Sequence, residues 1–139
     1  MGLASILKSR LIPAELENHI NRIRKPIGSL GYDPWGYNNE VMKYGFSLTR
    51  QIYEKYFRVE AAGVDKIPSE GPVLIVPNHS GQLPVDGLLI AYALASREKN
   101  PRIPRAMIER FFPTVPYLGN LLNEFGAVLG DPTNCAKML

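Results

Sequence analysis

The stretch of sequence that decides the fold is GPVLIVPNHSGQLPVDG, residues 71–87. Its apolar residues 73–76 lie between proline and glycine signals, a pattern that predicts a short strand buried on both faces. Asp86 then precedes a second apolar run, residues 88–95, and as a plausible N-cap it indicates a helix there. The chain therefore runs from a strand through a polar loop into a helix. Ligands of open α/β sheets gather at the carboxyl ends of strands, so we expect the functional site in this loop.

The polar loop carries His79 and Asp86, the two residues on which acid–base chemistry would depend. A neutral imidazole takes a proton from a hydroxyl near neutral pH, and a nearby carboxylate holds its tautomer and stabilises the imidazolium that forms. Gly81 and Pro84 favour an irregular backbone that brings Asp86 back toward the ring. A histidine in a turn and an aspartate that caps a helix more often have structural roles, and this alternative stands beside the catalytic one.

The same stretch resembles the first motif of the glycerolipid acyltransferases, the superfamily of 1-acylglycerol-3-phosphate acyltransferase. In that family the motif is Asn-His-x4-Asp, with the histidine as general base and the aspartate as its orienting partner. Six residues, 80–85, separate His79 from Asp86 in this chain instead of four. That spacing resembles the branch related to monoacylglycerol and diacylglycerol acyltransferases, where a Gly-x-Leu-Pro insertion precedes the aspartate.

The resemblance extends over further segments of the chain, namely residues 33–37, 64–72, 105–110 and 126–134. Many members place an arginine near the end of the second motif, where this chain has Pro132 and Thr133, so we assign no phosphate role there. The third motif of the family, Phe-Pro-Glu-Gly, is not found in the sequence. We therefore expect an N-terminal fragment of an acyltransferase, truncated at its C-terminus, that contains the base and lacks part of the acceptor site.

The resemblance implies an O-acyltransferase that moves a fatty acyl group from an acyl thioester to a hydroxyl of a (lyso)glycerophospholipid or related glycerolipid. His79 would deprotonate the hydroxyl and Asp86 would orient and charge-stabilise His79. Acyl-CoA or acyl-carrier protein is the expected donor, with no bound cofactor and no metal. The expected substrate-binding residues are loop residues, which either position the loop or donate to the developing oxyanion, and arginines that meet phosphate: Asn78, Ser80, Gly81, Arg102, Arg105 and Arg110.

Two other functions remain open from the residues alone. A non-catalytic membrane-surface or protein-binding module could keep the acyltransferase fold without turnover. A serine hydrolase that uses Ser80 is less favoured, because the sequence has no Gly-x-Ser-x-Gly elbow.

Composition agrees with an ordinary globular chain of 139 residues, 45% hydrophobic and 21% charged. A net charge of +3 is too modest to indicate nucleic-acid binding. The single cysteine, Cys135, excludes an internal disulfide, and no apolar run approaches the ~20 residues of a membrane span. We expect a cytoplasmic protein that is peripheral at the membrane surface.

The N-terminal stretch, residues 1–27, is basic and carries apolar residues at helical spacing, with Pro13 expected to break or restart the helix. Such a helix lies on an anionic membrane surface or packs on its own domain with a solvated basic face, and the sequence favours neither.

We expect an N-terminal helical region over residues 1–57 and the first part of an acyltransferase α/β domain over residues 58–139. A helix is predicted from about residue 41 to 57, another up to Phe125, and one just begun at 134–139. Strands are predicted at 57–62, 73–76, 103–108 and 127–129, which together form an α/β sheet flanked by helices.

Overall fold

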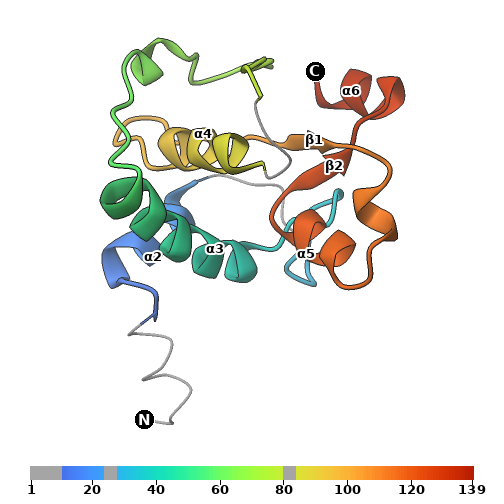
Figure 1. The fold of residues 1–139 in the computed structure, drawn as a ribbon, viewed down its shortest axis with the longest axis horizontal. Coiled ribbons are helices and arrows are strands. Elements are labelled where there is room, and N and C mark those ends of the chain that lie inside the picture. The colour runs from blue at the N-terminus through green and yellow to red at the C-terminus, as the bar shows by residue number, and fades with distance from the viewer. Residues whose placement is uncertain (1–10, 24–27, 80–83) are drawn as a thin grey trace, which may run out of the picture.

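Helices dominate the fold in the computed structural model, which describes residues 11–23, 28–79 and 84–139 (Figure 1). The elements in chain order are α2 (Ala14–Arg22), α3 (Asn39–Gln51), the π-helix η1 (Ile52–Tyr56), the 3-10 helix η2 (Val64–Lys66), α4 (Val85–Ala95), β1 (Ala106–Ile108), the 3-10 helix η3 (Phe112–Thr114), α5 (Leu118–Glu124), β2 (Ala127–Leu129) and α6 (Pro132–Met138).

Helices α2, α3 and α4 pack together around the core, as Figure 1 shows. Each places an apolar stripe inward: Leu16 and Ile20 from α2, Phe46 from α3, and Tyr92 from α4 are all buried. The Phe46 and Tyr92 rings meet edge to face with their centroids 5.9 Å apart, a favoured aromatic arrangement. The core therefore joins side chains from both sides of residue 57, and the predicted division of the chain there stays a prediction.

The predicted helical restart near Pro13 is confirmed, since α2 begins at the following residue. Its apolar face is buried in the core, including Ile20 at 1% exposure. This described part of the N-terminal stretch therefore packs on its own domain. The rest of the stretch, residues 1–10 and 24–27, lies outside the described residues.

The predicted helix from residue 41 is present and begins two residues earlier, at Asn39. Asn38 is its N-cap, and the side-chain oxygen of Asn38 accepts hydrogen bonds from the backbone N–H groups of Glu40 and Val41, at 2.9 and 3.3 Å. After α3 the backbone widens into η1. The predicted helix 88–95 is α4, and the helices near 118–125 and 134–139 are α5 and α6.

The sheet is smaller than the sequence predicts. Strands β1 and β2 pair in parallel, with Ala106 opposite Ala127 and Ile108 opposite Leu129, and they form the only sheet in the described part of the chain. They confirm the strand at 127–129 and the second half of the strand at 103–108. The structure is thus mostly helical, with a two-stranded parallel sheet in place of the larger sheet that we expected.

The predicted strand at 73–76 is wrong in this structure. Residues 72–79 are irregular, and Leu74 and Val76 are 63% and 82% exposed. An apolar run predicts burial, but a strand also needs a neighbour that completes its hydrogen bonds. Among the described residues the two assigned strands pair with each other and not with this segment.

The predicted strand at 57–62 is also wrong, because its first residues terminate a helix. The N–H of Val59 donates to the carbonyl of Tyr53 at 3.0 Å, and Arg58 between them has a positive φ of 49°. This helix end resembles a Schellman motif, with a left-handed residue followed by a bond back into the helix, but its bond is one residue wider because η1 is a π-helix. The N–H groups of Phe57 and Val59 therefore bond to the helix and are not available to pair with a neighbouring strand.

Candidate active site

His79 and Asp86 approach each other at the point where the irregular segment 72–79 and the start of α4 meet. The Nδ1 of His79 lies 2.7 Å from the Oδ2 of Asp86. The two side chains are 52% and 30% exposed, so solvent and small molecules can reach the pair. The approach of Asp86 to the imidazole ring that we expected from the sequence is confirmed, although the histidine does not come from a strand.

Helix α4 holds the aspartate, but Asp86 is not the N-cap that we predicted. Pro84 occupies the cap position, and Asp86 lies in the first turn. The other carboxylate oxygen of Asp86, Oδ1, is 2.7 Å from the backbone N of Gly87 and accepts its hydrogen. The positive end of a helix dipole favours a carboxylate in this turn. The carboxylate therefore spans the backbone of α4 and the imidazole of His79.

This arrangement is the one a general base requires. An ionised carboxylate accepts hydrogen bonds, so the Nδ1 of a neutral His79 would carry the proton toward Asp86. The lone pair is then on Nε2, for which the described residues provide no hydrogen-bond partner. A hydroxyl that reached Nε2 could give up its proton there, and Asp86 would stabilise the imidazolium formed.

The remaining loop residues predicted for substrate binding are only partly visible. Asn78 precedes His79 and is exposed. Ser80 and Gly81 lie outside the described residues. The structure therefore brings together His79 and Asp86, while the roles of the other three residues stay predictions.

The predicted phosphate-binding arginines have different surroundings. Arg105 forms an ion pair with Asp33 and lies over the ring of Tyr37, with its Cζ atom 4.7 Å from the ring centroid. Burial lowers the pKa of Arg105 to about 10, so the guanidinium is charged at neutral pH. These contacts favour a structural role for Arg105. Arg110 is exposed in the turn after β1, where a phosphate could reach it.

A hollow beside α4 was not predicted from the sequence. It has a volume of about 230 Å³ and an apolar lining. The lining residues come from α4 and from the segment that covers it: Val59, Ala61, Val64, Ile67, Ile75, Leu89, Ile90, Ala93 and Leu94. The sequence of α4 could have indicated this hollow, because the helix is apolar on nearly all sides and such a helix requires cover on more than one face.

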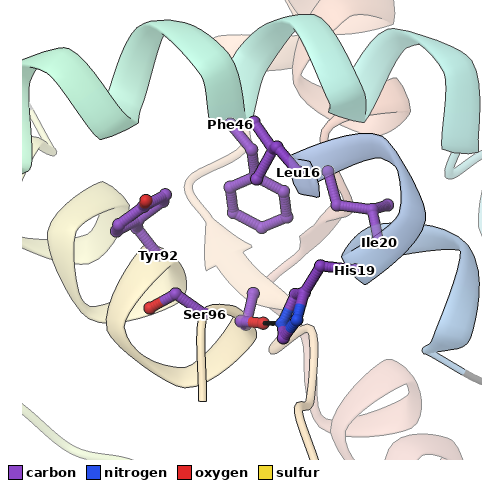
Figure 2. A pocket seen from close by; sticks show the side chains of 7 residues that line it. Leu16, His19, Ile20, Phe46, Tyr92 and Ser96 are labelled. Carbon is purple, nitrogen blue, oxygen red and sulfur yellow. Dashed lines mark hydrogen bonds between the residues drawn. The ribbon is translucent and has the colours of Figure 1, made fainter. Parts of the chain in front are cut away.

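The second histidine, His19, is part of the packing between helices. Its Nε2 is 2.7 Å from the carbonyl oxygen of Ala95, the last residue of α4. Figure 2 shows this contact beside Phe46 and Tyr92, at a small pocket between α2, α3 and α4. The pocket holds about 10 Å³, roughly one water molecule. It is a packing defect and too small for a substrate.

Two further classes of site were tested against the structure. Histidine, cysteine, aspartate and glutamate side chains nowhere gather into a group of three that could hold a metal ion, as far as the chain is described. Within the same residues, none of the helices combines the length and the apolar character needed to cross a bilayer.

Comparison with known proteins defines the class of this chain. Residues 58–138 match the Acyltransferase family, and the chain belongs to that family. An uncharacterized protein of Mycobacterium tuberculosis and one of Mycobacterium bovis are each 29% identical to it over 113 residues. An uncharacterized protein of Mycobacterium leprae is 27% identical over the same length. These matches cover 81% of this chain and 30% of each relative, so the chain spans about a third of their length. No solved structure matches.

Proposed function

We propose that this chain carries the base of an O-acyltransferase that acts on glycerolipids. The observation that carries the proposal is the 2.7 Å contact between His79 and Asp86, in a chain that belongs to the Acyltransferase family. The half-exposed imidazole supports it, because a substrate hydroxyl must be able to reach the ring.

In the proposed reaction the hydroxyl proton passes to Nε2 of His79 as the hydroxyl oxygen attacks the thioester carbonyl. The carbon–sulfur bond then breaks, and the thiolate leaves with the proton from the imidazolium. Asp86 keeps the imidazole in the required tautomer and offsets its positive charge. No serine or cysteine acyl-enzyme is needed.

The donor in this proposal is acyl-CoA or acyl-carrier protein, and the acceptor is a lysophospholipid or an acylglycerol at a membrane surface. Family membership supports an acyl donor and an acceptor without specifying either. The seven-residue step from His79 to Asp86 favours the acylglycerol branch. Arg110 is the arginine whose exposure leaves it available for a phosphate group.

Thiol release from acyl-CoA, measured with lysophosphatidate, monoacylglycerol or diacylglycerol as acceptor, tests the proposal. His79→Ala should lower kcat by about 10²- to 10⁴-fold, the contribution of a general base. His19→Gln is the matched control, because its amide can still donate to the carbonyl of Ala95 while the other histidine is kept. A folded His79→Ala variant with the turnover of the control would refute the mechanism.

A non-catalytic binding module is the second candidate. The exposed apolar side chains of Leu74 and Val76 favour it, because a binding partner could cover them. This candidate predicts no acceptor-dependent thiol release in any form of the protein whose fold is intact.

A further inference from the structure

Arg102 links α4 to the segment that leads to His79. Its main-chain N–H donates to the carbonyl of Leu94 in the last turn of α4, at 3.2 Å. The side chain of Arg102 then reaches the other way. Its Nη1 donates to the carbonyl of Pro68 at 2.9 Å, and its Nη2 to the carbonyl of Gly71 at 2.8 Å. One residue thus connects the helix of Asp86 with the chain just before residues 72–79.

Arg97 makes a second link of the same kind. It follows Ser96, the C-cap of α4, and its Nη2 donates to the carbonyl of Ile67 at 3.2 Å. Its Nη1 is buried and has no hydrogen-bond partner among the described residues. Two guanidinium groups that follow α4 therefore bind three backbone carbonyl groups, those of Ile67, Pro68 and Gly71.

The segment 72–79 depends on such links because the described part of the chain gives it few others. The described residues form no backbone hydrogen bond to this segment. Its Leu74 and Val76 side chains point into solvent rather than into a core, at 63% and 82% exposure. Of its apolar side chains, Ile75 lines the hollow on α4. The segment is thus held by the arginines before its start and by the His79–Asp86 contact at its end.

We propose that Arg102, with Arg97, is a positioning residue that fixes the segment carrying His79 against α4, so that His79 meets Asp86. The proposal rests on the proposed function of this pair as the catalytic base. It assigns Arg102 to backbone carbonyls instead of the phosphate that the sequence suggested. The planar fork of a guanidinium serves two carbonyl oxygens at once, whereas a lysine ammonium is a point charge on a flexible stem.

A double-mutant cycle separates positioning from the other roles. Arg102→Gln should lower kcat about tenfold or more with KM changed by less than about twofold, because a misplaced base impairs proton transfer and not binding. In an Asp86→Asn background, where the pair is already impaired, the same change should cost less than about twofold. An equal loss in both backgrounds refutes the proposal in favour of a general structural effect. A raised KM that Arg102→Lys restores refutes it in favour of phosphate binding.

A spectroscopic measurement on the 139-residue chain tests the same proposal without turnover. Long-range ¹H–¹⁵N spectra, recorded where the imidazole is neutral, report which ring nitrogen of His79 carries the proton. The wild type should show the Nδ1–H tautomer, and Arg102→Gln should shift the population toward Nε2–H and increase the backbone mobility of residues 72–79. Arg50→Gln, which removes a partly exposed guanidinium from its pair with Glu54, is the control.

The two measurements fail in different ways. If no acyl transfer is found, the proposed function fails, while the tautomer of His79 still reports on the positioning role. If Arg102→Gln leaves both the tautomer and the mobility of residues 72–79 unchanged, the positioning proposal is wrong, whatever the enzymatic activity.

Discussion

Replacement of Asp33 by alanine should destabilise the fold strongly, because this carboxylate holds together a loop and the residue before β1. Its side chain is only 1% exposed. Its Oδ1 accepts hydrogen bonds from the backbone N–H groups of Trp35 and Tyr37, both at 2.9 Å, and its Oδ2 pairs with Arg105. Asp33→Ala removes three partners in a single step.

The expected magnitude follows from those contacts. Removal of one partner of a buried ion pair costs about 3–5 kcal/mol, because the other charge is left without compensation. Arg105 retains 21% exposure of its side chain, so water solvates it in part. We therefore expect the lower end, a loss of about 3 kcal/mol in the free energy of unfolding, which is a large share of the roughly 5–15 kcal/mol of a typical domain.

Urea denaturation followed by circular dichroism measures this loss. With a urea m-value of about 1–3 kcal/mol/M, a loss of ~3 kcal/mol lowers the midpoint by about 1–3 M. Asp65→Ala, at an exposed position in η2, is the matched control and should stay within about 0.5 kcal/mol of wild type.

The double variant Asp33→Asn with Arg105→Met carries the reasoning further. It removes both charges and keeps an oxygen for the two N–H groups, so it should be more stable than Asp33→Ala alone. A midpoint for Asp33→Ala that matches the Asp65→Ala control would refute the structural role that we assign to this pair.

Three further predictions concern stability, alkaline pH and association. Burial and the nearby Glu54 raise the pKa of Tyr92 to about 12, so the free energy of unfolding should fall as pH rises from about 10 to 12. Tyr92→Phe should remove up to ~2–3 kcal/mol of that fall, as measured by urea denaturation at each pH. An unchanged pH dependence would contradict it. Gly45→Ala should lower the free energy of unfolding by about 1–3 kcal/mol, because a Cβ there would lie 2.6 Å from a ring carbon of Phe125. The same substitution in an open helix position usually raises that free energy by ~1 kcal/mol, so a raised melting temperature would show that the contact is wrong. Val76 is an apolar side chain that is 82% exposed, so Val76→Lys should reduce self-association in sedimentation velocity. The free energy of unfolding should change by less than about 0.5 kcal/mol, and a loss of folding would show that Val76 is part of the core.

Local patterns were sufficient to predict most of the helices. Helix α3 has an apolar face of period 3.6, and this signal lies within the helix itself. The cap residue Asn38 was not used in the prediction, which therefore placed the start of the helix two residues late. The strand at 127–129 is a short apolar run bounded by turn residues. The helix depends on neighbours in sequence, which is why sequence analysis found it, whereas the apolar run at 127–129 became a strand because β1 lies beside it.

The strand predicted at 73–76 shows where such reasoning fails. A run of apolar residues indicates what the segment would bury, but it does not supply the neighbouring strand. The N-cap predicted at Asp86 was also wrong. Pro84 already occupies the cap, and the carboxylate turns toward His79 instead.

The candidate site was predictable only in part. The motif brought His79 and Asp86 to attention, and the structure places them 2.7 Å apart. The contacts of Arg102 with Pro68 and Gly71 could not be predicted, because they depend on how a loop lies against the end of α4. The spacing of residues in the sequence does not indicate that these two segments lie close together.

The central claim is that His79, oriented by Asp86, removes the proton from the acceptor hydroxyl. Its most direct test is the kcat of acceptor-dependent thiol release from acyl-CoA, compared between wild type and Asp86→Asn in a form of the protein that turns over. Asp86→Asn keeps the shape of the side chain and removes the charge that holds the Nδ1–H tautomer, so kcat should fall by about 10²-fold or more. A folded Asp86→Asn variant with wild-type kcat would contradict the account.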